Sequence, residues 1–362
     1  MNSRRILKIL SGGVESFFLP KYKNFSKLLI KSDGTNWVLN SITKEMMQLC
    51  KDLKIENIDE KFEKFISNQC IFYTSKYSVL HNNWKKPKNR IAFPYYHGDP
   101  STAKQFKDMI KIIEINHADI SRIQVSHSKM NEIILNTGID SSKVFQIPIS
   151  IDIESFAFVD EIKKQNSRKE LNIDQNKILI GSFQKDGDGW GDGNVPKLIK
   201  GPDLFLKTIK ILKEKHKEIE VLLTGPARGY VKRGLEKLKV KYHHFYFDKY
   251  ENIEKYYHAL DLYLITSREE GGPRAVLESM ATGTPLVTFN VGQAIDLANH
   301  GVNSWVAKVE NIDELSHYAD HVIKNIDSIS QIKNNARKTA EENSYKEQLP
   351  LWLSFMNGFV ER

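Results

Sequence analysis

Residues 262–288 read LYLITSREEGGPRAVLESMATGTPLVT, and this stretch indicates the fold. It holds two apolar runs with the composition of buried strands, at 262–265 and 285–288. Between them, a glycine pair and a proline precede a segment with helical spacing of its apolar residues. A strand, a helix and a second strand in this order are typical of a parallel α/β sheet.

The same alternation extends along the chain in both directions. Further strands are expected at 37–40, 70–73, 91–93, 122–126 and 144–148, and again at 178–181, 220–223 and 244–247. Helices are expected at 43–53, 106–115 and 203–213. We therefore predict an α/β protein with two Rossmann-like doubly wound domains, at 1–153 and 154–343, that face a central cleft where a ligand binds. Residues 344–362 are expected to form a helix that returns to the first domain, with Trp352, Leu353 and Phe355 as its packing face.

Composition excludes several classes of protein. The 362 residues are 40% hydrophobic and 27% charged, which excludes collagen-like and wholly disordered chains. No apolar run approaches the roughly 18 residues of a transmembrane helix. The short apolar patch after Arg5 is interpreted as mature structure, with a signal peptide as the less favoured alternative. Cys50 and Cys70 are expected to be reduced, packed thiols of a cytoplasmic protein, although one disulfide is the other option.

Positive charge is concentrated in the first part of the chain. The net charge is +8 overall, with +9 in residues 1–150 and −1 in residues 151–362. A basic cluster with a proline lies at 84–90 and is either a solvated loop or a patch that faces a membrane or phosphates. This distribution favours a negative partner, such as anionic lipid, a phosphorylated acceptor or nucleic acid, but no nucleic-acid-binding module is recognisable.

The loop within the opening stretch has the features of an anion site. Gly271, Gly272 and Pro273 lead into the helix, where free backbone N–H groups and the helix dipole favour phosphate. Glu270 precedes the glycines and Glu278 lies about two turns into the helix, so these acids can hold hydroxyl groups of a ligand. The alternative is two solvated carboxylates beside an ordinary glycine turn. Arg274 either assists the phosphates or faces solvent.

This segment resembles the donor site of retaining glycosyltransferases of the GT-B fold, family 4 (glycosyl transferases group 1). The resemblance rests on the separation of Glu270 and Glu278, on residues 281–287 and on residues 291–294, and it is strong over residues 120–310. The chain departs from the pattern at Gln293, where a glycine is usual, and at Ile149–Ser150, where Asn-Gly is usual.

The resemblance implies a sugar-nucleotide donor, UDP- or GDP-linked, whose diphosphate is neutralised by basic side chains. Lys200, which precedes Gly201, matches the family's lysine; Ser182 stands where an arginine is usual, so Lys185 is the nearest replacement. His97 resembles the first-domain histidine that reaches the transferred sugar, with a loop-capping role as the alternative. Gly225 ends a strand where the family contacts the nucleotide.

A glycine-rich loop at 186–193 separates Lys185 from Lys200. Its alternating carboxylates faintly resemble a calcium loop, but the glutamate that closes an EF-hand is absent. A loop beside the donor phosphates, with Trp190 as a cover or an anchor, is favoured. No metal and no cofactor are expected.

The expected function is therefore metal-independent, retaining transfer of a sugar from a nucleoside diphosphate to a hydroxyl group of a glycan or lipid-linked saccharide. The expected catalytic residues are Lys200, Lys185, Glu270 and His97, and the expected donor-binding residues are Gly271, Gly272, Pro273, Arg274, Glu278, Gly225 and Ser182. Peripheral contact with an anionic membrane at the cytoplasmic face is a further expectation. An inverting GT-B transferase or epimerase, and a non-catalytic sugar-nucleotide-binding subunit, are the alternatives.

Overall fold

The computed structural model describes residues 25–32, 38–58, 68–80, 89–189, 191–246 and 253–361. The chain divides into two compact units. The first consists of Met1–Ile147 together with Leu349–Arg362, and the second of Pro148–Gln348. The boundaries expected from the sequence were 153 and 343.

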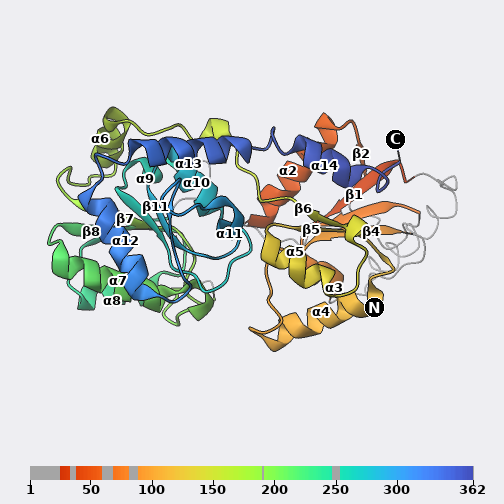
Figure 1. Cartoon of the computed structure of the whole chain (residues 1–362), viewed down its shortest axis with the longest axis horizontal. Helices are drawn as coiled ribbons and strands as arrows, with labels where there is room; N and C mark the ends of the chain where they lie inside the picture. Colours follow the sequence, from red (N-terminus) through yellow and green to blue (C-terminus); the bar gives the residue numbers. More distant parts are fainter. Residues whose placement is uncertain are drawn as a thin grey trace, which may run out of the picture. The chain divides into compact units, whose positions relative to one another are not determined.

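The first unit is built on a parallel sheet of six strands in the order β2-β1-β3-β4-β5-β6 (Figure 1). The strands are β1 Lys27–Lys31, β2 Glu56–Ile58, β3 Cys70–Tyr73, β4 Arg90–Pro94, β5 Ile120–Val125 and β6 Val144–Gln146. The helices are α2 Val38–Asp52, α3 Lys76–Leu80, α4 Lys104–Asn116, α5 Ser128–Leu135 and α14 Leu349–Met356, with a 3-10 turn at Ser141–Lys143.

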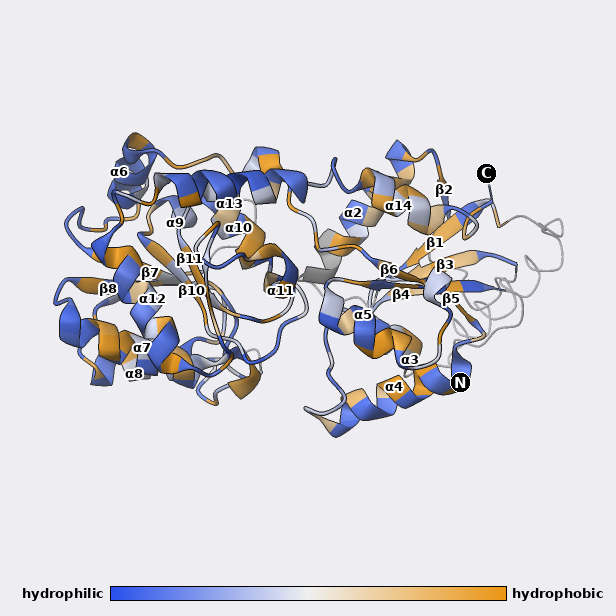
Figure 2. Ribbon diagram, viewed as in Figure 1, coloured by the Kyte–Doolittle hydropathy of each residue, from blue (hydrophilic) through white to orange (hydrophobic). Residues whose placement is uncertain are grey.

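Successive residues of each strand supply two separate cores, one on each face of this sheet. Leu28 and Cys70 belong to a cluster covered by α2 and α14, whereas Leu29 and Ile71 belong to a cluster covered by α4 and α5. This is the two-residue alternation of a strand. Because both faces are buried, strands such as β3, with the sequence CIFY, are continuously hydrophobic (Figure 2).

The C-terminal segment completes the first of these cores. Phe355 is fully buried, and its ring centroid lies 6.0 Å from that of Phe72 and 5.3 Å from that of Trp352. Arg122 donates to the carbonyl oxygen of Phe355 at 3.3 Å. The expected packing face is correct for Trp352 and Phe355 but wrong for Leu353, which is 43% exposed.

The strand expected at 37–40 is wrong, because Val38–Asp52 is helix α2. Its buried residues Ile42, Met46, Leu49 and Cys50 recur at helical spacing, and this longer pattern outweighs the local strand preference of Val38. Both cysteines are free and buried, and burial raises the pKa of each thiol to about 12. They are therefore packed thiols, as expected.

The second unit contains a second parallel sheet, in the order β12-β11-β10-β7-β8-β9. Its strands are β7 Ile178–Ser182, β8 Ile219–Thr224, β9 Tyr242–Phe245, β10 Leu262–Ile265, β11 Leu286–Phe289 and β12 Trp305–Ala307. Its helices are α6 Glu161–Glu170, α7 Pro202–Lys215, α8 Gly229–Lys237, α9 Glu254–His258, α10 Arg274–Thr282, α11 Ala294–Leu297, α12 Ile312–Lys324 and α13 Ser330–Glu342, with 3-10 turns at Ile153–Ser155 and Leu198–Lys200.

Helices cover both faces of this sheet as well, with α7, α8 and α12 in one layer and α9, α10 and α13 in the other (Figure 1). The two Rossmann-like α/β units expected from the sequence are thus confirmed. The chain begins the sheet at β7, adds β8 and β9 on one side, and then crosses back to place β10 on the other side. Such a switch point brings two loops together at the carboxyl ends of neighbouring strands.

Within the part of the chain that the structure describes, every helix is too short or too polar to cross a lipid bilayer.

Candidate active site

The switch point between β7 and β10 brings two sequence-predicted residues into contact. Lys200 lies at the end of the loop that follows β7, and Glu270 lies in the loop that follows β10. The Nζ atom of Lys200 is 2.6 Å from Oε2 of Glu270. The lysine side chain is 26% exposed and the glutamate 9% exposed, so the cation is the member of the pair that a ligand reaches more easily.

Polar side chains fix the other side of this carboxylate. Ser267 Oγ lies 2.8 Å from Oε1 of Glu270 and 3.0 Å from Oε1 of Gln184. The amide of Gln184 in turn donates to the carbonyl oxygen of Lys200 at 2.7 Å. The two loops are therefore joined by a closed set of contacts that holds Lys200 and Glu270 in one arrangement.

Gly201 allows the loops to approach each other so closely. Its φ is +65°, and a Cβ atom at this position would lie 1.8 Å from the carbonyl oxygen of Thr266. Thr266 also donates through Oγ1 to the carbonyl oxygen of Gly201 at 3.0 Å. Only glycine combines this backbone conformation with this contact.

Gly271, Gly272 and Pro273 lead into helix α10, which begins at the half-buried Arg274. Pro273 is the residue directly before the helix and does not belong to its first turn. Gln293 fixes this entrance, because its Oε1 accepts from Ile149 N at 3.1 Å and its Nε2 donates to Pro273 O at 3.4 Å. Two departures from the family pattern, Gln293 and Ile149, thus contact each other.

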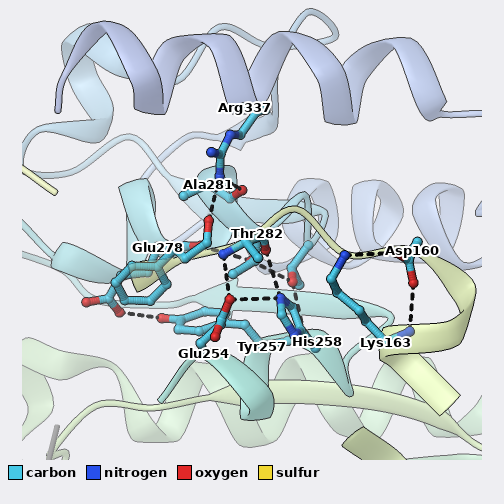
Figure 3. Close-up of polar contacts among 12 residues, drawn as sticks. Asp160, Lys163, Glu254, Tyr257, His258, Glu278, Ala281, Thr282 and Arg337 are labelled. Atoms are coloured by element: carbon cyan, nitrogen blue, oxygen red, sulfur yellow. Dashed lines mark hydrogen bonds and ion pairs between the residues drawn. The ribbon is translucent and has the colours of Figure 1, made fainter. Parts of the chain in front are cut away.

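Glu278 lies in α10 and is buried, with 3% of its surface exposed. Its Oε2 accepts a hydrogen bond of 2.8 Å from the hydroxyl of Tyr257 (Figure 3). The ring of Tyr257 packs 4.8 Å from that of Phe183, which follows β7, and 5.2 Å from that of Tyr263 in β10. The carboxylate is therefore bonded by Tyr257 of α9, whose ring packs against these two aromatic residues, and it is not a solvated surface group.

Lys197 was not predicted, yet it belongs to the same site. Burial lowers the pKa of its ammonium, and the positive charges of Lys200 and Lys185 lower it further. Its carbonyl oxygen accepts from Lys200 N at 2.8 Å, so the two lysines lie within one turn of chain. The three-residue spacing from Lys200 could have indicated it. Lys200 thus contacts Glu270 directly, and the charges of Lys185 and Lys200 both act on Lys197.

Ser182 ends β7 and is buried behind the site. Its carbonyl oxygen accepts from Arg228 Nη1 at 2.7 Å, and its Oγ accepts from Nη2 at 3.2 Å. Arg228 was not predicted; its side chain is completely buried, and its Nε lies 3.1 Å from Oδ1 of Asp186. Burial raises the pKa of Asp186. No pattern in the sequence indicates this pair, because its two members are 42 positions apart.

Asp186 of this pair is the first residue of the glycine-rich loop at 186–193, whose far end also packs closely against its surroundings. Gly193, with φ +71°, approaches so closely that a Cβ atom would lie 2.2 Å from the carbonyl of Ala227. Gly229 N donates to the carbonyl oxygen of Asp192 at 2.7 Å. Gly225 directly follows β8, with φ +81°, and its carbonyl oxygen lies 2.8 Å from His244 Nε2. Beside this loop is a groove of about 700 Å³, lined in part by Asp192, Pro226 and Tyr246.

His97 follows β4 in the first unit, where its ring centroid lies 5.6 Å from that of Phe106. Trp190 and most of the basic cluster at 84–90 lie outside the described residues. Among the residues that are described, no three histidine, cysteine, aspartate or glutamate side chains gather as ligands for a metal ion.

Comparison with known proteins finds a family model that matches the part of the chain carrying this site. Residues 195–339 match the model described as Glycosyl transferases group 1. The lipopolysaccharide core biosynthesis mannosyltransferase LpsB of Rhizobium meliloti is 26% identical over 183 residues, which cover 48% of this chain and 49% of LpsB. The O-antigen biosynthesis glycosyltransferase WclY of Escherichia coli is 33% identical over 130 residues, which cover 36% of this chain and 33% of WclY. The chain thus spans less than half of the length of these curated relatives.

A solved structure shares the fold over nearly the whole chain. The crystal structure of Anabaena Alr3699/HepE in complex with UDP and glucose superposes with a TM-score of 0.72, at 14% identity, over 91% of this chain and 99% of that one. The expected GT-B fold is thereby confirmed. Residues 195–339, which contain Lys197, Lys200, Glu270 and Glu278, are thus similar to the glycosyl transferases group 1 family, and they lie within a chain of the GT-B fold.

Proposed function

We propose that this protein is a retaining glycosyltransferase of family 4. It transfers a hexose-type sugar from a UDP- or GDP-sugar to a hydroxyl group of a glycan or lipid-linked saccharide during the assembly of a polysaccharide. The observation that carries the proposal is the contact between Lys200 and Glu270 at the switch point of the matched domain. The names of LpsB and WclY support the acceptor class, and the UDP bound to HepE supports the donor class.

The positive groups of the site stabilise the leaving group in this proposal. As the bond between the anomeric carbon and the phosphate oxygen breaks, negative charge develops on the diphosphate. In this proposal Lys200, Lys185 and the N–H groups at the start of α10 stabilise that charge, and such preorganised charge is usually the largest catalytic contribution. Glu270 is already held by Lys200 and Ser267, so it orients the sugar hydroxyls rather than attacking the sugar.

The acceptor attacks from the face that the leaving group departs from. Its oxygen forms the new bond to the anomeric carbon, and its proton passes to the departing phosphate oxygen, so no side chain needs to act as nucleophile. Glu278 receives the ribose hydroxyls, since a buried carboxylate accepts hydrogen bonds that strengthen in a water-poor site. His97 contacts the transferred sugar. No step in this scheme requires a metal ion.

The net charge of +9 on residues 1–150 supports a second part of the proposal, in which the protein associates peripherally with an anionic membrane at the cytoplasmic face. Each basic residue near such a surface contributes about 1 kcal/mol of attraction. Sedimentation with vesicles of anionic lipid, at low and high salt, tests this part. Equal sedimentation with neutral and anionic vesicles would contradict it.

The transfer activity is tested with the purified protein and a panel of UDP- and GDP-sugars. One of them should raise the melting temperature of the wild type, because a ligand that binds the native state stabilises it. Lys200→Ala should reduce donor turnover at least about 100-fold, whereas Lys207→Ala, which removes an exposed lysine of α7, should leave it unchanged. NMR of the product should show retention at the anomeric carbon. An inverted product would refute the retaining mechanism, and a protein that binds donors without turnover would be a non-catalytic subunit.

A further inference from the structure

A buried lysine lies beneath the loop that carries His97. Lys76 begins α3, directly after β3, and is only 4% exposed. Its Nζ atom lies 4.0 Å from the ring centroid of Tyr95 and 4.9 Å from that of Phe106. An ammonium group enclosed by aromatic faces is stabilised there although it has lost its water. A lysine is almost never buried without such partners.

The ammonium of Lys76 donates a hydrogen bond to the carbonyl oxygen of His97. The next peptide is held as well, because the hydroxyl of Tyr95 donates to the carbonyl oxygen of Gly98 at 2.9 Å. Gly98 has φ +117°, and a Cβ atom at this position would lie 2.8 Å from Lys76 Nζ and 2.8 Å from Phe106. The backbone at 97–98 therefore rests on Lys76 and Tyr95 with no room for a side chain between them.

The residue that follows anchors the loop from its other end. Lys129 Nζ lies 2.7 Å from Oδ2 of Asp99, and Ser101 donates to Oδ1 through both its N–H, at 2.9 Å, and its hydroxyl, at 2.6 Å. With both flanks fixed, the position of the His97 backbone depends on the peptide that Lys76 holds. The ring of His97 also contacts Phe106, an aromatic residue that encloses Lys76.

We propose that Lys76 is a positioning residue, which sets the orientation of His97 toward the transferred sugar without touching the substrate itself. This inference rests on the proposed function for its catalytic consequence. Its structural part, that the buried ammonium determines where the His97 ring points, stands separately. A displacement of about 1 Å at a reacting centre can lower the rate about 100-fold. Replacement of Lys76 should therefore lower kcat.

The experiment compares Lys76→Met with the wild type. Methionine keeps the length and apolar stem of lysine but cannot donate to the carbonyl oxygen of His97. We expect kcat to fall 10- to 100-fold and the KM for the donor to stay within about twofold. The NMR resonances of the His97 ring should move in the same variant. Lys107→Met, which changes an exposed lysine of α4, should leave both kcat and the His97 resonances unchanged.

A double-mutant cycle with His97→Ala separates positioning from a general loss of stability. If Lys76 acts through His97, Lys76→Met should cause no further loss of kcat in the His97→Ala background. Tyr95→Phe, which keeps the ring and removes only the bond to Gly98, provides a milder second variant and should show a smaller loss of the same kind. Unchanged His97 resonances in Lys76→Met, or losses that multiply in the double variant, would overturn the inference. A wild type without transfer activity would instead refute the proposed function, and the NMR comparison would still test the role of Lys76.

Discussion

Replacement of Gly201 by alanine is expected to separate Lys200 from Glu270. A Cβ atom at this position would lie 1.8 Å from the carbonyl oxygen of Thr266, whereas real Cβ contacts are essentially never shorter than 3.0 Å. The two segments must therefore move apart by more than about 1 Å. Lys200 precedes Gly201, and Glu270 lies four residues after Thr266, so the movement is transmitted to the ion pair.

The magnitude follows from two contributions. The left-handed backbone, at φ +65°, costs a residue with a Cβ atom about 1–2 kcal/mol. The forced movement of packed backbone adds about 1–3 kcal/mol. For catalysis, a displacement of about 1 Å between Lys200 and Glu270 predicts a loss of about 100-fold in donor turnover.

Gly301→Ala is the matched control. Gly301 has φ +71°, and no described atom would lie within 4 Å of the added Cβ, so this variant bears the conformational cost alone. Urea denaturation should show Gly201→Ala to be less stable than Gly301→Ala by about 1–3 kcal/mol, and a donor-turnover assay should show a loss only in Gly201→Ala. Equal stability and equal turnover in the two variants would refute the reasoning.

Three further predictions follow. Tyr257→Phe removes the hydroxyl that donates to Glu278, so the free energy of unfolding measured in urea should fall by about 1.5–3 kcal/mol. An unchanged midpoint of the urea transition would contradict this prediction. Phe355→Ala leaves a cavity in the first unit and should cost about 3–5 kcal/mol in the same assay. Burial opposes ionisation of Asp99, but hydrogen bonds from Lys129 and Ser101 outweigh it and lower its pKa from 3.8 to about 2. The ionised Asp99 carboxylate should contribute about 2 kcal/mol to the free energy of unfolding, in full above about pH 5, and this contribution should be lost as the pH falls through about 2. Asp99→Asn should therefore lose less stability in acid than the wild type does.

The buried strands were the most predictable elements of the fold. Strands β3 and β10 run over Cys70–Tyr73 and Leu262–Ile265, as expected, because strands buried on both faces are continuous apolar runs. Strand β1 was missed, since its three apolar residues lie between Lys27 and Lys31. The first residues of the helix at Val38–Asp52 favour strands locally, so the sequence predicts a strand at 37–40 where the structure has the start of α2.

The candidate site was predictable where its residues follow neighbouring strands. Lys200 and Glu270 lie in loops that the switch point brings together, so their contact follows from the order of strands. Arg228 and Lys76 could not be found in this way, because their partners are distant in the sequence or are backbone carbonyl groups. The spacing of residues in a sequence motif does not predict contacts of these two kinds.

The C-terminal segment has a consequence for the synthesis of this protein on the ribosome. The core of the first unit joins Phe72 to Phe355, and Cys70 Sγ lies 2.8 Å from the carbonyl oxygen of Phe359, 289 residues later in the chain. One face of the sheet in the nascent first unit, which α2 covers only in part, therefore stays incompletely covered until translation has passed the whole second unit. During this interval the exposed face is a natural target for chaperones, and a ribosome that stalls late would release a chain whose second unit is folded and whose first is not.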